Sequence, residues 1–130
     1  CVLLLDIDHF KKVNDRLGHQ VGDQVLTAVA HCIEEQVRSL DRVGRNGGEE
    51  FLVLLPDTEL EEAAEVAERV RIAVSRLVIE GVPEDHPIHV SIGCAEYRAE
   101  DDNLGELIRR ADEAMYAAKL AGRNRVVKAA

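Results

Sequence analysis

The order of extended and helical segments predicts an α/β chain of the α+β kind, built on a central antiparallel sheet. Strand-like and helix-like patterns alternate along the chain without a linker, a repeat or a low-complexity stretch. A tight turn joins two strands in the middle, and such a hairpin makes its strands antiparallel. The resulting order, βααββαβ, predicts helices on one face of the sheet. With 130 residues there is room for one domain, residues 1–130.

The first half of the chain supplies a strand, two helices and the hairpin. Residues 2–7 form an apolar strand, and residues 10–17 form a short helix. After a turn over residues 18–22, residues 24–38 carry apolar side chains at helical spacing. The hairpin strands cover residues 42–45 and 50–55.

The second half supplies one long helix, a strand and a final helix. Thr58 and Glu61 have the spacing of a capping box, which predicts the start of an amphipathic helix reaching residue 77. A loop with two prolines leads to a strand over residues 89–96. The final helix, residues 104–121, is stopped by Gly122, and residues 124–128 form a short closing strand.

The hairpin turn carries the chemistry of this chain. Asn46-Gly47 predicts a type I′ turn, and residues 51–55 form a buried strand that ends at Pro56. Gly47 and Gly48 let the backbone approach a ligand closely, and two adjacent glutamates follow them. This pattern suits a phosphate-bearing ligand with a divalent metal. A plain Asn-Gly hairpin is the alternative, because such turns are common.

Composition excludes several classes of function. The net charge of −9 disfavours binding to a nucleic-acid polymer, although a few cations and a metal can still hold one nucleotide. No apolar run approaches the roughly 20 residues of a membrane helix, so we expect no membrane contact. Three cysteines without metal-ligand spacing indicate inert thiols in a reduced, cytoplasmic setting.

Acidic residues follow both the first strand and the hairpin turn. If the first and third strands are neighbours in the sheet, Asp6 approaches Glu49 and Glu50. Such a cluster is strained by repulsion unless Mg²⁺ or Mn²⁺ occupies it, which predicts phosphoryl or nucleotidyl transfer. The alternative for Asp6 and Asp8 is a strand end followed by a helix cap.

Seven segments occur in the order seen in the GGDEF domains of bacterial diguanylate cyclases. They are Asp6-Ile-Asp-His-Phe-Lys11, Asn14-Asp-Arg-Leu-Gly-His19, Gly22-Asp23, Gly47-Gly-Glu-Glu-Phe51, Ser91-Ile-Gly93, Ala111-Asp112 and Ala118-Lys-Leu-Ala-Gly-Arg-Asn124. The chain therefore resembles this family, in its GGEEF variant, from residue 2 to residue 127. The resemblance implies a ferredoxin-like palm similar to class III nucleotide cyclases and DNA polymerases. Family members usually carry a helical segment before the first strand, and often a sensor domain before that; neither is in this sequence.

The resemblance implies a catalytic metal centre. Asp6 and Glu49 hold the metals, with the carbonyl of Ile7 as a further ligand. Glu50 is a second-metal ligand or helps to deprotonate the attacking 3′-hydroxyl, and the sequence leaves both roles open. Two Mg²⁺ or Mn²⁺ ions per site are expected.

The resemblance also implies a binding site for GTP. The backbone of Gly47 and Gly48 lies along the α-phosphate, and the helix-start amides of His9 and Phe10 cradle the terminal phosphates. The cations that neutralise the triphosphate are Lys11, Lys119 and Arg123, of which the last two lie one helical turn apart. The guanine readers are Asn14 and Asp23. Surface charge for the cations, and a helix cap for Asp23, are the alternatives.

A third set of residues resembles the family's inhibitory product site. Arg38 and Asp41 have the family spacing from Gly47, and Arg69 matches a position that completes the site from another subunit. An isolated Arg-x-x-Asp is otherwise usually a helix-end ion pair.

The expected function is that of a diguanylate cyclase, which condenses two GTP into cyclic di-GMP and two pyrophosphates. A homodimer aligns the two GTP molecules, cyclic di-GMP inhibits the enzyme, and an upstream sensor domain regulates it. The alternative function is a non-catalytic receptor for cyclic di-GMP.

Overall fold

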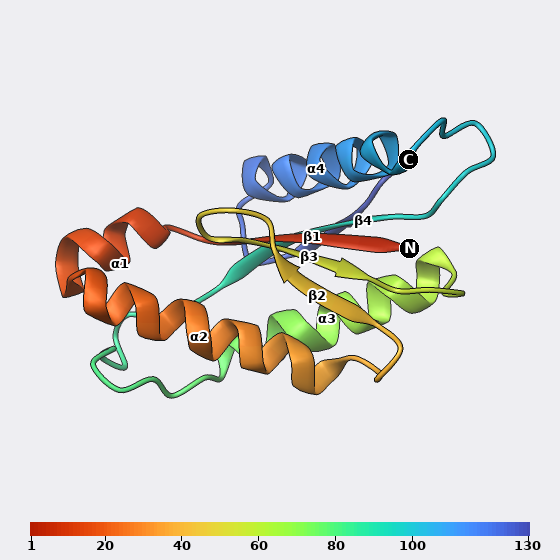
Figure 1. Cartoon of the computed structure of the whole chain (residues 1–130). Helices are drawn as coiled ribbons and strands as arrows, with labels where there is room; N and C mark the ends of the chain where they lie inside the picture. Colours follow the sequence, from red (N-terminus) through yellow and green to blue (C-terminus); the bar gives the residue numbers. More distant parts are fainter.

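A five-stranded sheet runs through the protein between two layers of helices (Figure 1). The structure is a computed structural model that describes residues 1–130. Its elements are β1 (Val2–Ile7), α1 (Phe10–Leu17), α2 (His19–Gln36), β2 (Arg42–Arg45), β3 (Glu50–Leu54), α3 (Leu60–Ser75), β4 (Val90–Ala95), α4 (Leu104–Leu120) and β5 (Val126–Lys128). This α/β architecture confirms the predicted fold class. None of its helices has the length and apolar character needed to cross a membrane.

The order of the strands is β2-β3-β1-β4-β5, so β1 occupies the centre of the sheet. β1 pairs antiparallel with β3 on one side and with β4 on the other, and only β5 adds in parallel, beside β4. All six residues of β1 and all six of β4 are buried. Strands that are apolar at nearly every position need a cover on both faces.

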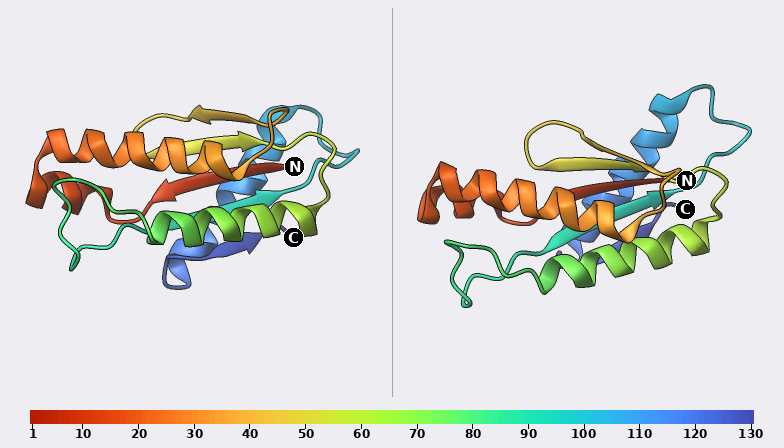
Figure 2. Two further views of the ribbon diagram at one scale, coloured as in Figure 1. Left: turned by 90° about the horizontal axis from the view of Figure 1, so that it is seen from below. Right: turned by 60° about the horizontal axis from the view of Figure 1, so that its bottom comes forward.

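Helices provide that cover on both faces, and the prediction that they lie on one face was wrong. Leu3, Leu5 and Ile7 of β1 belong to the larger core, which includes α2 and α3. Val2 and Leu4, on the other face, pack with Leu107, Ala111 and Met115 of α4. Figure 2 shows α2 and α3 together on one side of the sheet and α4 on the other.

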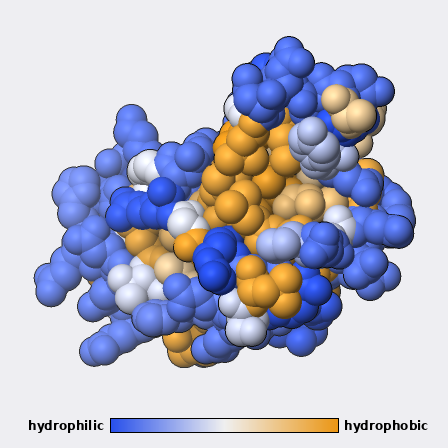
Figure 3. Space-filling view, turned by 45° about the vertical axis from the view of Figure 1, so that its right-hand side comes forward, coloured by the Kyte–Doolittle hydropathy of each residue, from blue (hydrophilic) through white to orange (hydrophobic).

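α4 lies unusually close to β4 at Gly93. A Cβ added to Gly93 would lie 2.0 Å from the carbonyl oxygen of Ala111 and 2.4 Å from the amide nitrogen of Met115. Both are backbone atoms, which cannot move away alone, so only glycine fits here. On the same face, Leu52 and Leu54 of β3 are half-buried against this core, and Figure 3 shows apolar side chains gathered beside α4.

The second helix begins five residues earlier than predicted. α2 starts at His19, and Gly18, with φ +93°, separates it from α1. The predicted turn over residues 18–22 is therefore confined to Gly18. Asp23 lies inside α2, so the helix-cap interpretation of Asp23 was wrong.

The predicted capping box at Thr58 is also absent. The residue before α3 is Glu59, and no side chain caps the helix. Thr58 instead donates its hydroxyl hydrogen to the carbonyl of Pro56 and accepts a hydrogen bond from Arg38. Thr58 therefore bonds to Arg38 and Pro56 and does not cap the helix.

Candidate active site and product pocket

Asp6 and Glu50 lie opposite one another at one end of the sheet because β1 and β3 are neighbours. Asp6 lies directly opposite Glu50 in the antiparallel register, and the amide of Ile7 donates to the carbonyl of Glu49 at 3.3 Å. The expected strand pairing is confirmed. It brings together carboxylates that are more than 40 positions apart in the sequence.

The hairpin turn uses its glycines differently from the prediction. Gly47 and Gly48 have φ of +94° and +48°, whereas Asn46 is not left-handed, so the type I′ turn at Asn46-Gly47 was wrong. The amide of Glu50 donates to the carbonyl of Gly47 at 2.9 Å and closes the turn. A Cβ at either glycine would meet no atom within 4 Å. The backbone of the turn is therefore open to a ligand.

The carboxylate of Asp6 is buried at this end of the sheet, with 5% of its surface exposed. Burial raises its pKa, repulsion from Glu49 and Glu50 raises it further, and the hydrogen bond and charge of Lys119 lower it. The ammonium Nζ of Lys119 lies 2.5 Å from Oδ2 of Asp6. A cation from α4 therefore offsets the negative charge of this carboxylate.

The donor set suits a divalent metal by its chemistry. Carboxylates of Asp6, Glu49 and Glu50 are hard oxygen ligands of the kind that Mg²⁺ prefers. The amide of Glu49 does not donate a hydrogen bond to the carbonyl of Ile7, so this carbonyl keeps a free lone pair facing Glu49. No three acidic, histidine or cysteine side chains converge closely enough to form a metal site as they stand. In this structure the carboxylate of Asp6 is paired with the ammonium of Lys119.

The start of α1 presents unpaired backbone donors beside the carboxylates. His9 precedes the helix in the left-handed region, with φ +56°. The amides of His9, Phe10 and Lys11 donate to no backbone carbonyl, whereas the amide of Asp8 is bonded to His89. Free amides at a helix start favour an anion. Lys11 is exposed next to them.

Arg123 reaches this region from beyond the end of α4. The helix ends at Leu120 and Arg123 has φ +65°, so the expectation that Lys119 and Arg123 share one helical face was wrong. The pKa of His9 is lowered by burial and then by the charges of Lys12 and Arg123, and the amide of Asn124, next to Arg123, donates to Asp8 at 3.0 Å. Arg123 and Lys119 therefore approach the site along different routes.

Asn14 and Asp23 lie on adjacent helices. A Cβ on Gly22 would be 1.9 Å from Oδ1 of Asn14, so the side chain of Asn14 lies flat against α2 at this glycine. Asp23 is exposed in an open depression that it shares with Gln20 and Gln24 but not with Asn14. In this structure the two expected guanine readers do not line one pocket.

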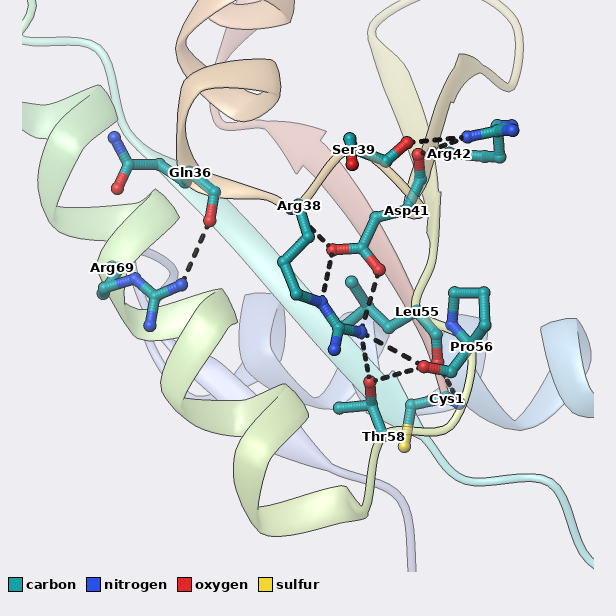
Figure 4. A network of polar contacts seen from close by, with 10 residues as sticks. All are labelled: Cys1, Gln36, Arg38, Ser39, Asp41, Arg42, Leu55, Pro56, Thr58 and Arg69. Carbon is teal, nitrogen blue, oxygen red and sulfur yellow. Dashed lines mark hydrogen bonds and ion pairs between the residues drawn. The ribbon is translucent and has the colours of Figure 1, made fainter.

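Arg38 and Asp41 form an ion pair just after the C-terminal end of α2 (Figure 4). Asp41 accepts from the amide of Arg38 at 2.8 Å and from its guanidinium Nε and Nη2 at 3.3 and 3.1 Å. Nη2 also donates to Thr58 Oγ1 and to the carbonyl of Pro56. The hydrogen bond to Asp41 raises the pKa of Arg38 above its ordinary value.

This ion pair lines a pocket of about 200 Å³ between α2 and α3. The side chain of Asp41 is 2% exposed, whereas that of Arg38 is 52% exposed and keeps Nη1 free of hydrogen bonds. Arg69 lines the same pocket from α3 of the same chain and donates to the carbonyl of Gln36 at 3.0 Å. The pocket thus presents two arginines, with Asp41 fully engaged in orienting one of them.

Sequence reasoning missed the role of Asp8. Its carboxylate is 8% exposed and accepts from Ser91 Oγ at 2.7 Å and from the amide of Asn124 at 3.0 Å. No local pattern pairs residues 116 positions apart. The only signal was the presence of Asp8, Ser91 and Asn124 in three separate segments of the recognised pattern.

Comparison with known proteins places this arrangement in a family. The family model described as "Diguanylate cyclase, GGDEF domain" matches residues 1–125. The diguanylate cyclase DgcM of Escherichia coli K12 is 45% identical over 128 residues, which are 98% of this chain and 30% of DgcM. The chain thus spans about a third of the length of this curated relative.

Solved structures show the same fold. The active GGEEF domain of a diguanylate cyclase from Vibrio cholerae superposes with a TM-score of 0.91 at 33% identity, covering 99% of this chain and 81% of the other. The GGDEF domain of DgcB from Caulobacter crescentus, in complex with c-di-GMP, superposes with a TM-score of 0.91 at 38% identity, covering 99% and 77%.

Proposed function

The chain belongs to the GGDEF family of diguanylate cyclases, and from that premise we propose that it condenses two GTP molecules into cyclic di-GMP and two pyrophosphates. The observation that carries this proposal is the pairing of Asp6 with Glu50 at one end of the sheet, beside an open glycine turn. A plain hairpin would not require two like charges to face a buried aspartate.

GTP would bind between the hairpin turn and the start of α1. The free amides of His9, Phe10 and Lys11 bind the terminal phosphates, with the side chains of Lys11 and Arg123 as countercharges. The backbone of Gly47 and Gly48 lies against the α-phosphate, because neither glycine has an obstructing neighbour. Asn14 and Asp23 contact the guanine. Because Asn14 lies on α1 and Asp23 on α2, the base would have to reach from one helix to the other.

The family implies a divalent metal, and we propose two Mg²⁺ or Mn²⁺ ions held by Asp6, Glu49, Glu50 and the carbonyl of Ile7. When bound, the metals stabilise the charge that develops on the α-phosphate and the leaving pyrophosphate. Lys119 would then release Asp6 to the metals and pair with the phosphates. Glu50 lies at the mouth of the turn, where its carboxylate can take the proton of the 3′-hydroxyl.

Catalysis would need two copies of the domain. One GTP bound per subunit offers its 3′-hydroxyl to the α-phosphorus of the other, and each attack breaks the bond to pyrophosphate. Two such attacks close the cyclic product. Alignment of the two sites would supply most of the rate enhancement. We place regulation in segments outside these residues, such as an upstream sensor domain.

The pocket at Arg38 and Arg69 favours a second role, the binding of cyclic di-GMP as an inhibitor. The two arginines offer forked donors that suit phosphates or the Hoogsteen edge of guanine. Asp41 is engaged by Arg38 in this structure, so a direct contact with guanine would require the ion pair to open. Residues 42–45 connect this pocket directly to the catalytic turn, which offers a route for inhibition.

Incubation with GTP and Mg²⁺, with chromatography of the products, tests the proposal. The chain, dimerised by a fused leucine zipper, should yield cyclic di-GMP and pyrophosphate in a ratio of one to two, and ATP in place of GTP should give far less product. Binding of cyclic di-GMP without any synthesis would instead support the receptor function.

A further inference from the structure

The turn that carries Arg123 is held in place by groups from two other elements. Arg123 and Asn124 both adopt left-handed backbone conformations, with φ of +65° and +47°. Two consecutive residues other than glycine rarely do so unless their surroundings impose it. The constraint therefore has to come from bonds to the rest of the molecule.

Asp8 supplies the first bond. Its buried carboxylate accepts from the amide of Asn124 through Oδ2, while Oδ1 accepts from Ser91 on β4. Asp8 lies between Asp6 and His9, at the point where β1 passes into α1. It therefore ties the turn after α4 to the segment whose free amides face the proposed phosphate site.

Arg71 of α3 supplies the second bond. Its Nη1 donates to Oδ1 of Asn124 at 3.0 Å, and its other nitrogens are held by both carboxylate oxygens of Glu68. The side chain of Arg71 is 21% exposed. Glu68 thus orients Arg71, which donates a hydrogen bond to Asn124. Arg71 lies on α3, a helix that contributes no residue to the proposed GTP site.

We propose that Arg71 and Asp8 are positioning residues, which fix the Arg123-Asn124 turn so that the guanidinium of Arg123 faces the terminal phosphates of GTP at the start of α1. Asp8 and Asn124 join the turn to β1, and Arg71 with Glu68 joins it to α3. The inference rests on the proposed function, because it assigns the ligand of Arg123. It adds a contribution from α3 to substrate binding.

A double-mutant cycle between Arg71 and Arg123 tests this inference without requiring turnover. The probe is the α,β-methylene analogue of GTP, whose reactive bond cannot be cleaved, titrated in the presence of Mg²⁺ by calorimetry. Arg123→Met should weaken binding about tenfold, as expected for one charge-assisted contact. Arg71→Met should weaken it roughly three- to tenfold, and should add less than twofold in the Arg123→Met background.

Arg109→Met is the matched control, because it breaks an exposed Arg-Glu pair on α4 that touches neither the turn nor α3. It should leave the affinity unchanged. If Arg71→Met unfolds the chain, Arg71→Lys keeps the charge and loses only the forked geometry, and should give a smaller effect in the same direction. Thermal unfolding of each variant checks that the fold is retained.

Equal losses from the Arg71 substitution in both backgrounds, or no loss in either, would overturn the positioning role while leaving the proposed function intact. Failure of the parent chain to bind the analogue at all would overturn both.

Discussion

The ammonium of Lys119 on α4 lies 2.5 Å from the buried carboxylate of Asp6 on β1, across 113 positions of sequence. Burial raises the pKa of Asp6 and repulsion from Glu49 and Glu50 raises it further, whereas the hydrogen bond and charge of Lys119 lower it. A divalent metal bound there would replace this ammonium.

Lys119→Met should destabilise the metal-free protein and strengthen its response to metal. Loss of the pair leaves Asp6 buried without a countercharge, so the free energy of unfolding in chelator should fall by about 1–3 kcal/mol. Added Mg²⁺ should then raise the Tm of the variant more than that of the parent, because it supplies the missing charge. Lys128→Met, which breaks an exposed pair with Glu61, should change neither quantity. Equal metal responses in parent and Lys119→Met would contradict this role.

Gly22→Ala should weaken GTP binding by displacing Asn14. The new Cβ would lie 1.9 Å from Oδ1 of Asn14, and a side-chain oxygen can move away where a backbone atom cannot. We expect a rise in KM for GTP of about tenfold, the cost of one good hydrogen bond, with little loss of stability. Gly44→Ala is the control, because its Cβ would meet nothing within 4 Å. An unchanged KM would remove Asn14 from the guanine site.

The thiols should differ sharply in reactivity. Burial raises the pKa of Cys94 to about 12, and burial also raises the pKa of Cys32. A thiol whose pKa lies above the ambient pH stays protonated, so the reactive thiolate of Cys94 is on the order of 10⁻⁴ of the total at pH 8. An aromatic disulfide reagent should therefore label at most Cys1 in the folded chain and three thiols in urea. Two or more rapidly labelled thiols in the folded chain at pH 8 would contradict the burial of Cys32 and Cys94.

Arg38→Ala should abolish tight binding of cyclic di-GMP and relieve inhibition. The substitution removes the half-exposed guanidinium and leaves Asp41 without its main partner, yet it leaves the carboxylates of the GTP site untouched. Calorimetry should show at least a roughly tenfold loss of product affinity, with the initial rate at low product unchanged. Arg109→Ala should behave as the parent. Inhibition that is purely competitive with GTP would place the product in the active site instead.

Much of the fold could be predicted because its signals are local. The apolar run of β1 and the turn residues of the hairpin identify their elements directly, whereas the pairing of β1 with β3 was only a condition of the predicted acidic cluster, which the structure confirms. The sequence of β4 also indicates that helices cover both faces of the sheet, because every position of this strand except Ser91 and Gly93 is apolar. The start of α2 was misplaced because Gly18 alone, with its positive φ, separates α2 from α1. The start of α3 was misplaced because the hydroxyl of Thr58 is bonded to Arg38, which lies far away in the sequence.

The sequence identifies the candidate site residues, which stay predictions, but it does not specify their contacts. The acidic pair, the glycines and the Arg38-Asp41 spacing can be recognised in the chain itself. The pairing of Lys119 with Asp6 and of Asn124 with Asp8 joins residues 113 and 116 positions apart. Such contacts depend on how α4 and its following turn return to β1, which no local pattern specifies.

The central claim is that Glu49 and Asp6 make this chain a cyclase, and the rate of cyclic di-GMP synthesis in Glu49→Gln tests it most directly. Glutamine keeps the size of the side chain and removes the charge that binds metal. The leucine-zipper dimer of the parent should convert GTP to cyclic di-GMP in the presence of Mg²⁺, and the variant should lose at least about 100-fold in rate, on the order of a lost metal ligand, while keeping its Tm. Synthesis by Glu49→Gln at the parental rate, with the same dependence on Mg²⁺, would contradict the account.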